Sequence, residues 1–221
     1  MADISPITFS IITSLVIAFL LWFALGTQRN VRRGGDTLRW LQTGLPLLGR
    51  RTTVKWLGSS AVELELLQPR PPFRKADVVV VLEPRDLSWL WALTRARGRR
   101  DFIILRARLE RAPGFELEAG DLRGWTGRDR LERLDPHGWE AAEWGSQWVR
   151  VAHTKGSDPE AVRRLWRAFD AASGGVWRLS VRREPPHLEV HVRLPRTTEG
   201  SAEPLFEALR ALAALVIQRG G

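Results

Sequence analysis

The 221-residue chain contains no cysteine, no tyrosine and a single asparagine, Asn30. The absence of cysteine excludes disulfides, thiolate metal sites and a cysteine nucleophile, although it does not identify the cellular compartment. Long low-complexity tracts are also absent, and 44% of the residues are hydrophobic, which together exclude wholesale disorder. The first 28 residues contain neither lysine nor arginine, so all 34 basic residues follow them.

The formal net charge is +9, and arginine far outnumbers lysine. A basic surplus of this kind suits a polyanionic partner, either nucleic acid or anionic lipid. The same bias arises in proteins of a GC-rich genome, and no nucleic-acid-binding motif accompanies it here. We therefore do not expect nucleic acid to be the partner.

Residues 7–25 form an apolar run without charge, proline or glycine. As a helix, the run is about 28 Å long, which is close to the hydrocarbon thickness of a bilayer. The N-terminus lacks the basic region of a cleavable export signal, and no good cleavage site follows the run. We predict a retained transmembrane anchor within residues 1–28, whose lipid-facing side chains include Ile7, Ile11, Leu15, Phe19, Trp22 and Leu25.

Basic residues stand on only one side of this run, where Arg29, Arg32 and Arg33 follow it closely. The positive-inside rule places that flank in the cytoplasm. We therefore expect a single-pass protein of a bacterial or archaeal plasma membrane, with its N-terminus outside and its C-terminal domain in the cytoplasm.

Small side chains recur every four residues within the run, at Ser10, Ser14 and Ala18. Such a stripe lets two membrane helices approach closely, which predicts self-association or association with another span. Chance spacing of small residues is the alternative interpretation.

Residues 29–51 are predicted to form a basic juxtamembrane segment. Gly34-Gly35 is expected to end the span, and Asp36 is expected to cap a short amphipathic helix. Two placements of residues 35–48 stay open, one on the membrane surface and one against the domain.

Residues 52–221 are predicted to form a cytoplasmic α+β domain in which helices cover one side of a mixed or antiparallel sheet. The first half, 52–111, combines a hairpin, a central strand at 77–84, a helix at 85–98 capped by Asp86, and a further strand. A connection rich in tryptophan and glycine, 112–146, leads to the second half, 147–221. That half has the order strand, helix, hairpin, helix, and its first helix begins at Asp158. The two halves are candidates for related ferredoxin-like units.

No catalytic residue, cofactor site or metal site emerges from the motifs. His187 and His191 share one face of a predicted strand, but residues four apart on a strand lie about 13 Å apart and cannot bind one zinc ion. Residues 44–52 imitate a phosphate-binding loop, yet arginines occupy the positions that require lysine and a hydroxyl residue. A serine nucleophile motif is missing as well. We therefore do not expect an enzyme.

Two sets of side chains are candidates for an interaction surface. Tryptophans are numerous for this length, and polar residues line one face of the second hairpin. The candidates are Trp125, Trp139, Trp144, Trp148, Arg178, Arg182, His187, His191 and Arg193.

The favoured function is non-catalytic: a membrane-anchored domain that binds a protein partner or assists assembly of a membrane complex. One alternative is a membrane-tethered enzyme or small-ligand-binding domain. A second is a basic domain that contacts anionic lipid or nucleic acid.

Overall fold

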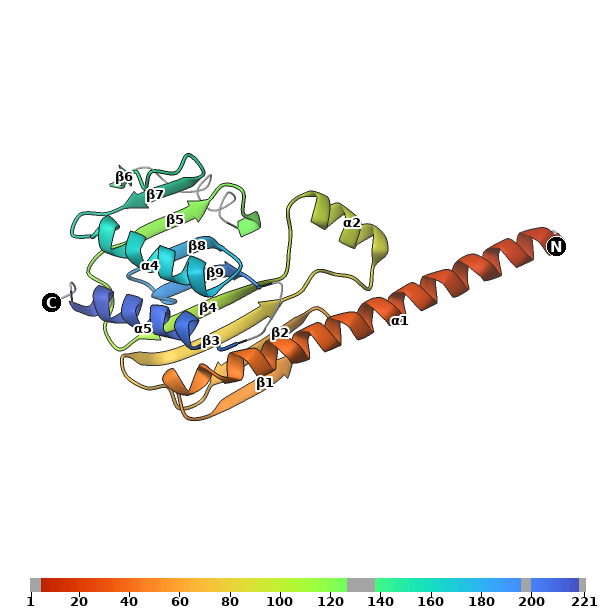
Figure 1. Cartoon of the computed structure of the whole chain (residues 1–221), viewed down its shortest axis with the longest axis horizontal. Helices are drawn as coiled ribbons and strands as arrows, with labels where there is room; N and C mark the ends of the chain where they lie inside the picture. The colour runs from red at the N-terminus through yellow and green to blue at the C-terminus, as the bar shows by residue number, and fades with distance from the viewer. Residues whose placement is uncertain (1–4, 127–137, 196–199, 219–221) are drawn as a thin grey trace.

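The computed structural model describes residues 5–126, 138–195 and 200–218, and it consists of one long helix followed by an α+β body (Figure 1). The helices are α1 (Pro6–Gln42), the short 3-10 helix η1 (Leu45–Leu47), α2 (Ser88–Ala96), α4 (Pro159–Ala172) and α5 (Glu203–Gln218). The strands are β1 (Thr52–Trp56), β2 (Ala61–Leu66), β3 (Phe73–Val81), β4 (Phe102–Leu109), β5 (Leu117–Asp121), β6 (Glu140–Ala142), β7 (Val149–His153), β8 (Val176–Val181) and β9 (Leu188–Arg193).

All nine described strands form one antiparallel sheet in the order β1-β2-β3-β4-β9-β8-β5-β7-β6. The first four strands are a simple meander, and β9 pairs with β4, so the two expected halves share one continuous sheet. The predicted α+β class with an antiparallel sheet is confirmed. A relationship between the halves stays a prediction.

The segment 112–146 is more regular than its composition indicates. Its residues Leu117–Asp121 form β5, which lies between β8 and β7, and all five residues are buried. The sequence of β5 is LEAGD, which lacks β-branched residues and holds two carboxylates, so its pattern does not predict a central strand.

Helices α4, α5 and the C-terminal part of α1 lie over one face of the sheet (Figure 1). Alternate strand residues supply the core on that face, for example Val78, Leu105 and Val190, and α5 contributes Leu205 and Leu209. Asp158 caps α4 as predicted, because its Oδ1 accepts a hydrogen bond from the Ala161 N–H at 3.0 Å. Helix α2 stands apart, beside α1 at the place where α1 leaves the body (Figure 1).

The predicted cap of α2 is wrong. The helix begins at Ser88 after Leu87, and no side chain caps it. Asp86 instead accepts a hydrogen bond from the Ser59 hydroxyl at 2.7 Å, which fixes the connection between β3 and α2 to the β1–β2 turn.

The predicted break at Gly34-Gly35 and the predicted short helix capped by Asp36 are also wrong, because α1 continues through both glycines to Gln42 and Asp36 lies inside it. Its buried residues Gly26, Asn30, Gly34, Thr37, Trp40 and Leu41 lie on one face that packs against the body. A Cβ on Gly34 would lie 2.6 Å from the Trp56 ring, so glycine permits a close helix contact here instead of ending the helix. Of the two placements considered for residues 35–48, the structure favours packing against the domain, because Trp40 and Leu41 are buried in its core.

The N-terminal half of α1 projects away from the body (Figure 1). Within the described residues, α1 is the one helix long and apolar enough to cross a bilayer, and no part of its most apolar stretch is buried in the body. The expected anchor residues Ile7, Ile11, Leu15, Phe19, Trp22 and Leu25 are 45–73% exposed, as lipid contact requires.

Candidate functional site

The body meets α1 directly after the apolar run. A Cβ on Gly26 would lie 2.2 Å from the Arg85 carbonyl oxygen, so only glycine fits there. Trp22 donates its indole N–H to the same carbonyl at 3.0 Å, and the Asn30 amide donates to the Glu83 carbonyl at 3.0 Å. These contacts hold the β3–α2 connection against the helix.

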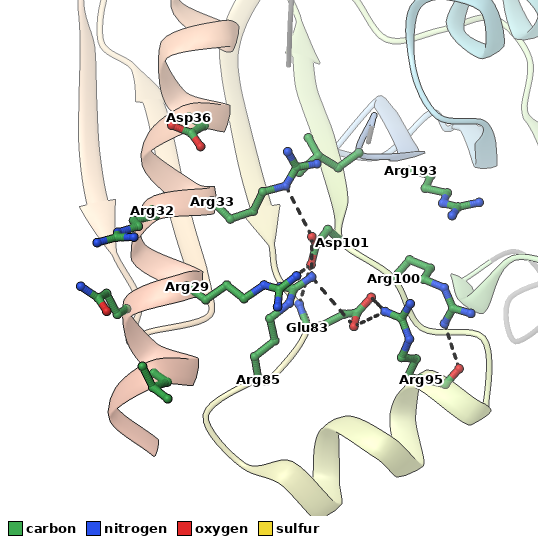
Figure 2. A pocket seen from close by; sticks show the side chains of 13 residues that line it. Arg29, Arg32, Arg33, Asp36, Glu83, Arg85, Arg95, Arg100, Asp101 and Arg193 are labelled. Atoms are coloured by element: carbon green, nitrogen blue, oxygen red, sulfur yellow. Dashed lines mark hydrogen bonds and ion pairs between the residues drawn. The ribbon is translucent and has the colours of Figure 1, made fainter. Parts of the chain in front are cut away.

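Two buried carboxylates organise the space between α1 and the sheet (Figure 2). Asp101 precedes β4 and accepts two hydrogen bonds from Arg85, at 3.0 and 2.9 Å, and one from the Glu83 N–H at 2.8 Å. Arg33 approaches the same carboxylate at 3.7 Å. Because both Asp101 and Arg85 are largely shielded from water, this pairing fixes the geometry more strongly than a surface ion pair would.

Glu83 follows β3 and is 2% exposed. It accepts hydrogen bonds from Arg95 at 2.9 and 3.0 Å and from the Trp91 indole at 2.5 Å. Arg95 also lies over the Trp91 ring, 5.4 Å from its centre. Glu83 thereby fastens α2 to the end of the sheet.

These groups line a cavity of about 920 Å³, here called the arginine pocket. Its lining contains seven arginines and three carboxylates, and the charged residues are Arg29, Arg32, Arg33, Arg85, Arg95, Arg100, Arg193, Asp36, Glu83 and Asp101. The pocket is therefore strongly cationic.

Several of these cations are not neutralised. Among the described residues, Arg29 and Arg193 have no carboxylate partner, and Arg100 donates only to the backbone carbonyls of Arg95 and Arg99. Figure 2 shows Arg29 directed toward the Asp101 cluster and Arg32 directed away from it, while Arg100 and Arg193 come from the opposite wall. An anion entering the pocket would meet Arg29, Arg100 and Arg193 from two sides.

Two further hollows adjoin the arginine pocket. A groove of about 460 Å³ between α1 and α2 shares Leu25, Arg29, Arg85 and Arg95 with it and adds Trp22, Gly26 and Trp91. A second cavity of about 640 Å³ shares Arg100 and Arg193. The groove thus joins a polar pocket to apolar side chains at the end of the membrane run.

The far face of the sheet carries a separate polar network. Glu118 is 1% exposed and contacts Arg178, accepts from Ser180 at 2.8 Å and pairs with Arg182 at 3.3 Å. Arg178 also pairs with Glu189 at 2.6 Å. These residues are cross-strand neighbours on β5, β8 and β9, so the network joins three strands across the sheet.

Three residues of the predicted interaction surface are buried and cannot form one. Trp144 packs edge-on against Trp166 at 5.6 Å, and His187 accepts the Leu109 N–H at 3.0 Å. His191 is 6% exposed and donates to Glu189 at 3.0 Å. Packing thus holds Trp144 inside the fold, and hydrogen bonds hold His187 and His191 there, although the Trp144 indole nitrogen and His191 Nδ1 have no hydrogen-bond partner among the described residues.

Some of the remaining residues of the predicted interaction surface stabilise the fold, and one of them lines the arginine pocket. Arg178 and Arg182 belong to the Glu118 network, whereas Arg193 lines the arginine pocket. Trp125 and Trp139 are half-buried, with Arg99 over the Trp125 ring at 6.0 Å, and Trp148 is 44% exposed with Arg123 over its ring at 5.8 Å. Ser10, Ser14 and Ala18 are exposed along α1, and their predicted role in helix association stays a prediction.

Five residues that line the arginine pocket were not predicted from the sequence: Glu83, Arg85, Arg95, Arg100 and Asp101. The sequence does contain a signal for two of them. Glu83 follows the apolar strand β3, Asp101 precedes the apolar strand β4, and a short helix connects the two strands. Carboxylates at such positions require cationic partners when they are buried. In the described part of the chain, no three histidine, aspartate or glutamate side chains are placed to share a metal ion.

The Glu189–His191 pair makes the stability of the fold depend on pH. Burial opposes ionisation of Glu189, but the hydrogen bond from His191 and the charges of Arg178 and Arg106 outweigh it and lower the pKa of Glu189 to about 2. Burial lowers the pKa of His191 below its ordinary value of 6.5. The unfolded chain therefore binds protons more readily than the folded chain at both groups.

We expect the stability of the protein to fall as the pH drops below 6.5, and to fall further from pH 4.5 toward 2. The ionised Glu189 contributes on the order of 3 kcal/mol at neutral pH. Thermal unfolding at pH 7 and pH 3 should show a smaller acid-induced loss for Glu189→Gln than for the original chain. The exposed Glu207→Gln is the control, and an equal acid-induced loss in all three chains would contradict the assignment.

The sequence matches no model of a known protein family and no curated protein at a significant level.

Proposed function

We propose that this chain is a single-pass protein of a bacterial or archaeal plasma membrane, with its N-terminus outside and its body in the cytoplasm. The arginines at 29, 32 and 33 support this orientation, because cationic residues next to a span are retained on the cytoplasmic side. We propose further that the body is a non-catalytic binding module, and that the arginine pocket binds the phosphate of an anionic lipid headgroup.

One observation carries this proposal: arginines on two opposite walls of one cavity have no carboxylate partner among the described residues, while the buried carboxylates of the cavity are already paired. Arg29 comes from α1, Arg100 from the connection between α2 and β4, and Arg193 from the end of β9 (Figure 2). Arginine favours phosphate because its planar guanidinium donates paired hydrogen bonds to phosphate oxygens. The cavity of about 920 Å³ is large enough for a headgroup.

Binding is favoured over catalysis by the chemistry of the lining. Arginine stays protonated and therefore serves poorly as a general base or acid. Glu83 and Asp101 are both engaged in hydrogen bonds with arginines. Among the described residues that line the pocket, none is a serine, threonine or histidine that could act as a nucleophile or proton carrier.

A lipid is favoured over a soluble phosphate by the location of the pocket. Leu25 ends the apolar run and lines both the pocket and the adjoining groove. The groove presents Trp22 and Trp91, which suit the apolar part of a lipid next to its phosphate. Anionic lipids also concentrate at the cytoplasmic surface of the membrane, where they attract clustered arginines.

The test uses the full chain in mild detergent and three probes: dihexanoyl phosphatidic acid, glycerol 3-phosphate and inorganic phosphate. We expect the short-chain lipid to bind at least tenfold more tightly than either soluble phosphate in calorimetry. The triple variant Arg29→Gln, Arg100→Gln, Arg193→Gln should weaken lipid binding by about a hundredfold, since it removes several charge-assisted hydrogen bonds. The control Arg150→Gln, Arg164→Gln, Arg167→Gln removes the same charge from exposed positions on β7 and α4.

The outcomes separate the parts of the proposal. Equal lipid binding by the triple variant and its control would show that the pocket is not the site. Equal binding of glycerol 3-phosphate and the lipid by the original chain would keep the anion site but overturn the lipid as its ligand.

Protein binding is a second candidate, supported by the open edge of β1. Its five residues are all exposed, and Val54, Trp56 and Leu57 are 40–46% exposed. An unpaired strand edge is a template for pairing with a strand of a partner. Purification of the tagged chain from native membranes in mild detergent tests this candidate, and recovery without a stable companion would contradict it.

A further inference from the structure

Helix α2 presents an apolar face that no described part of the chain covers. Trp89 is 65% exposed and Leu93 is 43% exposed, and Ala92 and Ala96 are exposed beside them. The spacing of these four residues places them on one side of the helix. A tryptophan exposed to this extent, within a wholly apolar helix face, indicates a surface that contacts something other than water.

The opposite side of α2 is fastened to the body, so its orientation is fixed. Thr94 is 7% exposed, Trp91 donates its indole N–H to Glu83 at 2.5 Å, and Arg95 pairs with the same carboxylate at 2.9 Å. The helix cannot turn its apolar face inward without breaking these buried contacts.

The position of α2 along α1 identifies what covers that face. The rings of Trp22 and Trp91 lie 6.4 Å apart, and Trp22 also donates to the Arg85 carbonyl. Leu25 lines the same groove as Trp22 and Trp91, so helix α2 lies at the level where the apolar run of α1 ends. A bilayer that surrounds the run to this point places its interfacial region at α2.

We propose that α2 is a second membrane contact, which lies in the bilayer interface with Trp89 and Leu93 turned toward the acyl chains. In this arrangement the exposed Arg95 and Arg97 lie at headgroup level. Tryptophan is favoured at this depth because its ring is apolar and its N–H is polar. Contacts through both α1 and α2 fix the orientation of the body relative to the membrane, whereas α1 alone would allow the body to change its tilt. This inference depends on α1 spanning the membrane, and it is independent of what the arginine pocket binds.

The absence of native cysteine makes a direct test possible, because a single introduced cysteine can be labelled selectively. The full chain is reconstituted into nanodiscs that contain anionic lipid, with a polarity-sensitive fluorophore at Trp89→Cys, Leu93→Cys or Ala96→Cys. Leu20→Cys within the apolar run is the membrane control, and Arg164→Cys on α4 is the solvent control. Quenching is measured with lipids that carry a nitroxide on the acyl chain and with aqueous iodide.

We expect the labels at positions 89, 93 and 96 to be quenched by the nitroxide lipid several-fold more than the label at 164, and to be protected from iodide. Quenching of these labels like that at 164 would overturn the proposal. Protection from both quenchers would identify a protein contact, such as a second copy of the chain, and would also overturn it. Because three positions are tested separately, failure of one variant to fold leaves the other two decisive.

Discussion

Replacement of Gly26 by alanine is expected to lower the free energy of unfolding by about 2–3 kcal/mol, because it separates α1 from the body. The added Cβ would lie 2.2 Å from the Arg85 carbonyl oxygen, 2.6 Å from the Arg85 carbonyl carbon and 2.7 Å from the Asp86 Cα. All three atoms belong to the backbone, so no side chain can rotate away to make room. The higher helix propensity of alanine offsets about 1 kcal/mol of the clash.

Gly35→Ala is the matched control, because it lies in the same helix and its Cβ would meet nothing within 4 Å. There we expect the protein to gain roughly 0.5–1 kcal/mol in stability from the better helix former. Urea unfolding of both variants in one detergent measures the difference. Equal stability of the two variants would show that α1 does not pack on the β3–α2 connection in this way.

The second large effect is expected for Asp101→Ala, with a loss of about 3–5 kcal/mol in the free energy of unfolding. Asp101 is 8% exposed and accepts two hydrogen bonds from Arg85 and one from the Glu83 N–H. Its removal leaves the guanidinium of Arg85 without its main partner inside the fold. The variant should also bind the short-chain lipid more weakly, because the walls of the arginine pocket lose their common anchor.

The control for this prediction is Asp36→Ala, which removes a carboxylate that pairs with Arg39 at 2.5 Å in an exposed position. We expect a change below about 1 kcal/mol, as for other exposed ion pairs. Thermal unfolding of both variants checks the difference in stability, and calorimetry of Asp101→Ala against the original chain checks lipid binding. A loss for Asp101→Ala no larger than for Asp36→Ala would contradict the role assigned to the buried carboxylate.

Local patterns in the sequence were sufficient for most of the fold. The alternation around Glu63 and Glu65 predicts β2, and Asp158-Pro159 predicts the start of α4, because period and cap chemistry act within a few residues. The apolar run at 7–25 likewise predicts the projecting half of α1, since its length and composition are local properties.

The errors arise where a distant contact overrides a local preference. Gly34 weakens a helix by itself, but Trp56 and Leu82 pack against it in the folded chain and the helix continues. The segment around β5 shows no strand pattern, yet pairing with β7 and β8 on both sides makes it a central strand.

The arginine pocket was unpredictable for the same reason. Its cations come from α1, α2, the connections before and after α2, and β9. The most distant of them in the sequence, Arg29 and Arg193, are 164 positions apart. No spacing rule joins residues that only the sheet order brings together. The sequence did indicate a basic surplus and a group of arginines next to the span. Arg29 and Arg33 belong to that group, and both line the pocket.

The most direct test of the whole account is labelling of single cysteines in intact cells with a membrane-impermeant maleimide. The account predicts that Asp3→Cys is labelled from outside, and that Arg164→Cys is labelled only after the cells are opened. Labelling of Arg164→Cys in intact cells, or recovery of the full chain in the supernatant after ultracentrifugation, would contradict it.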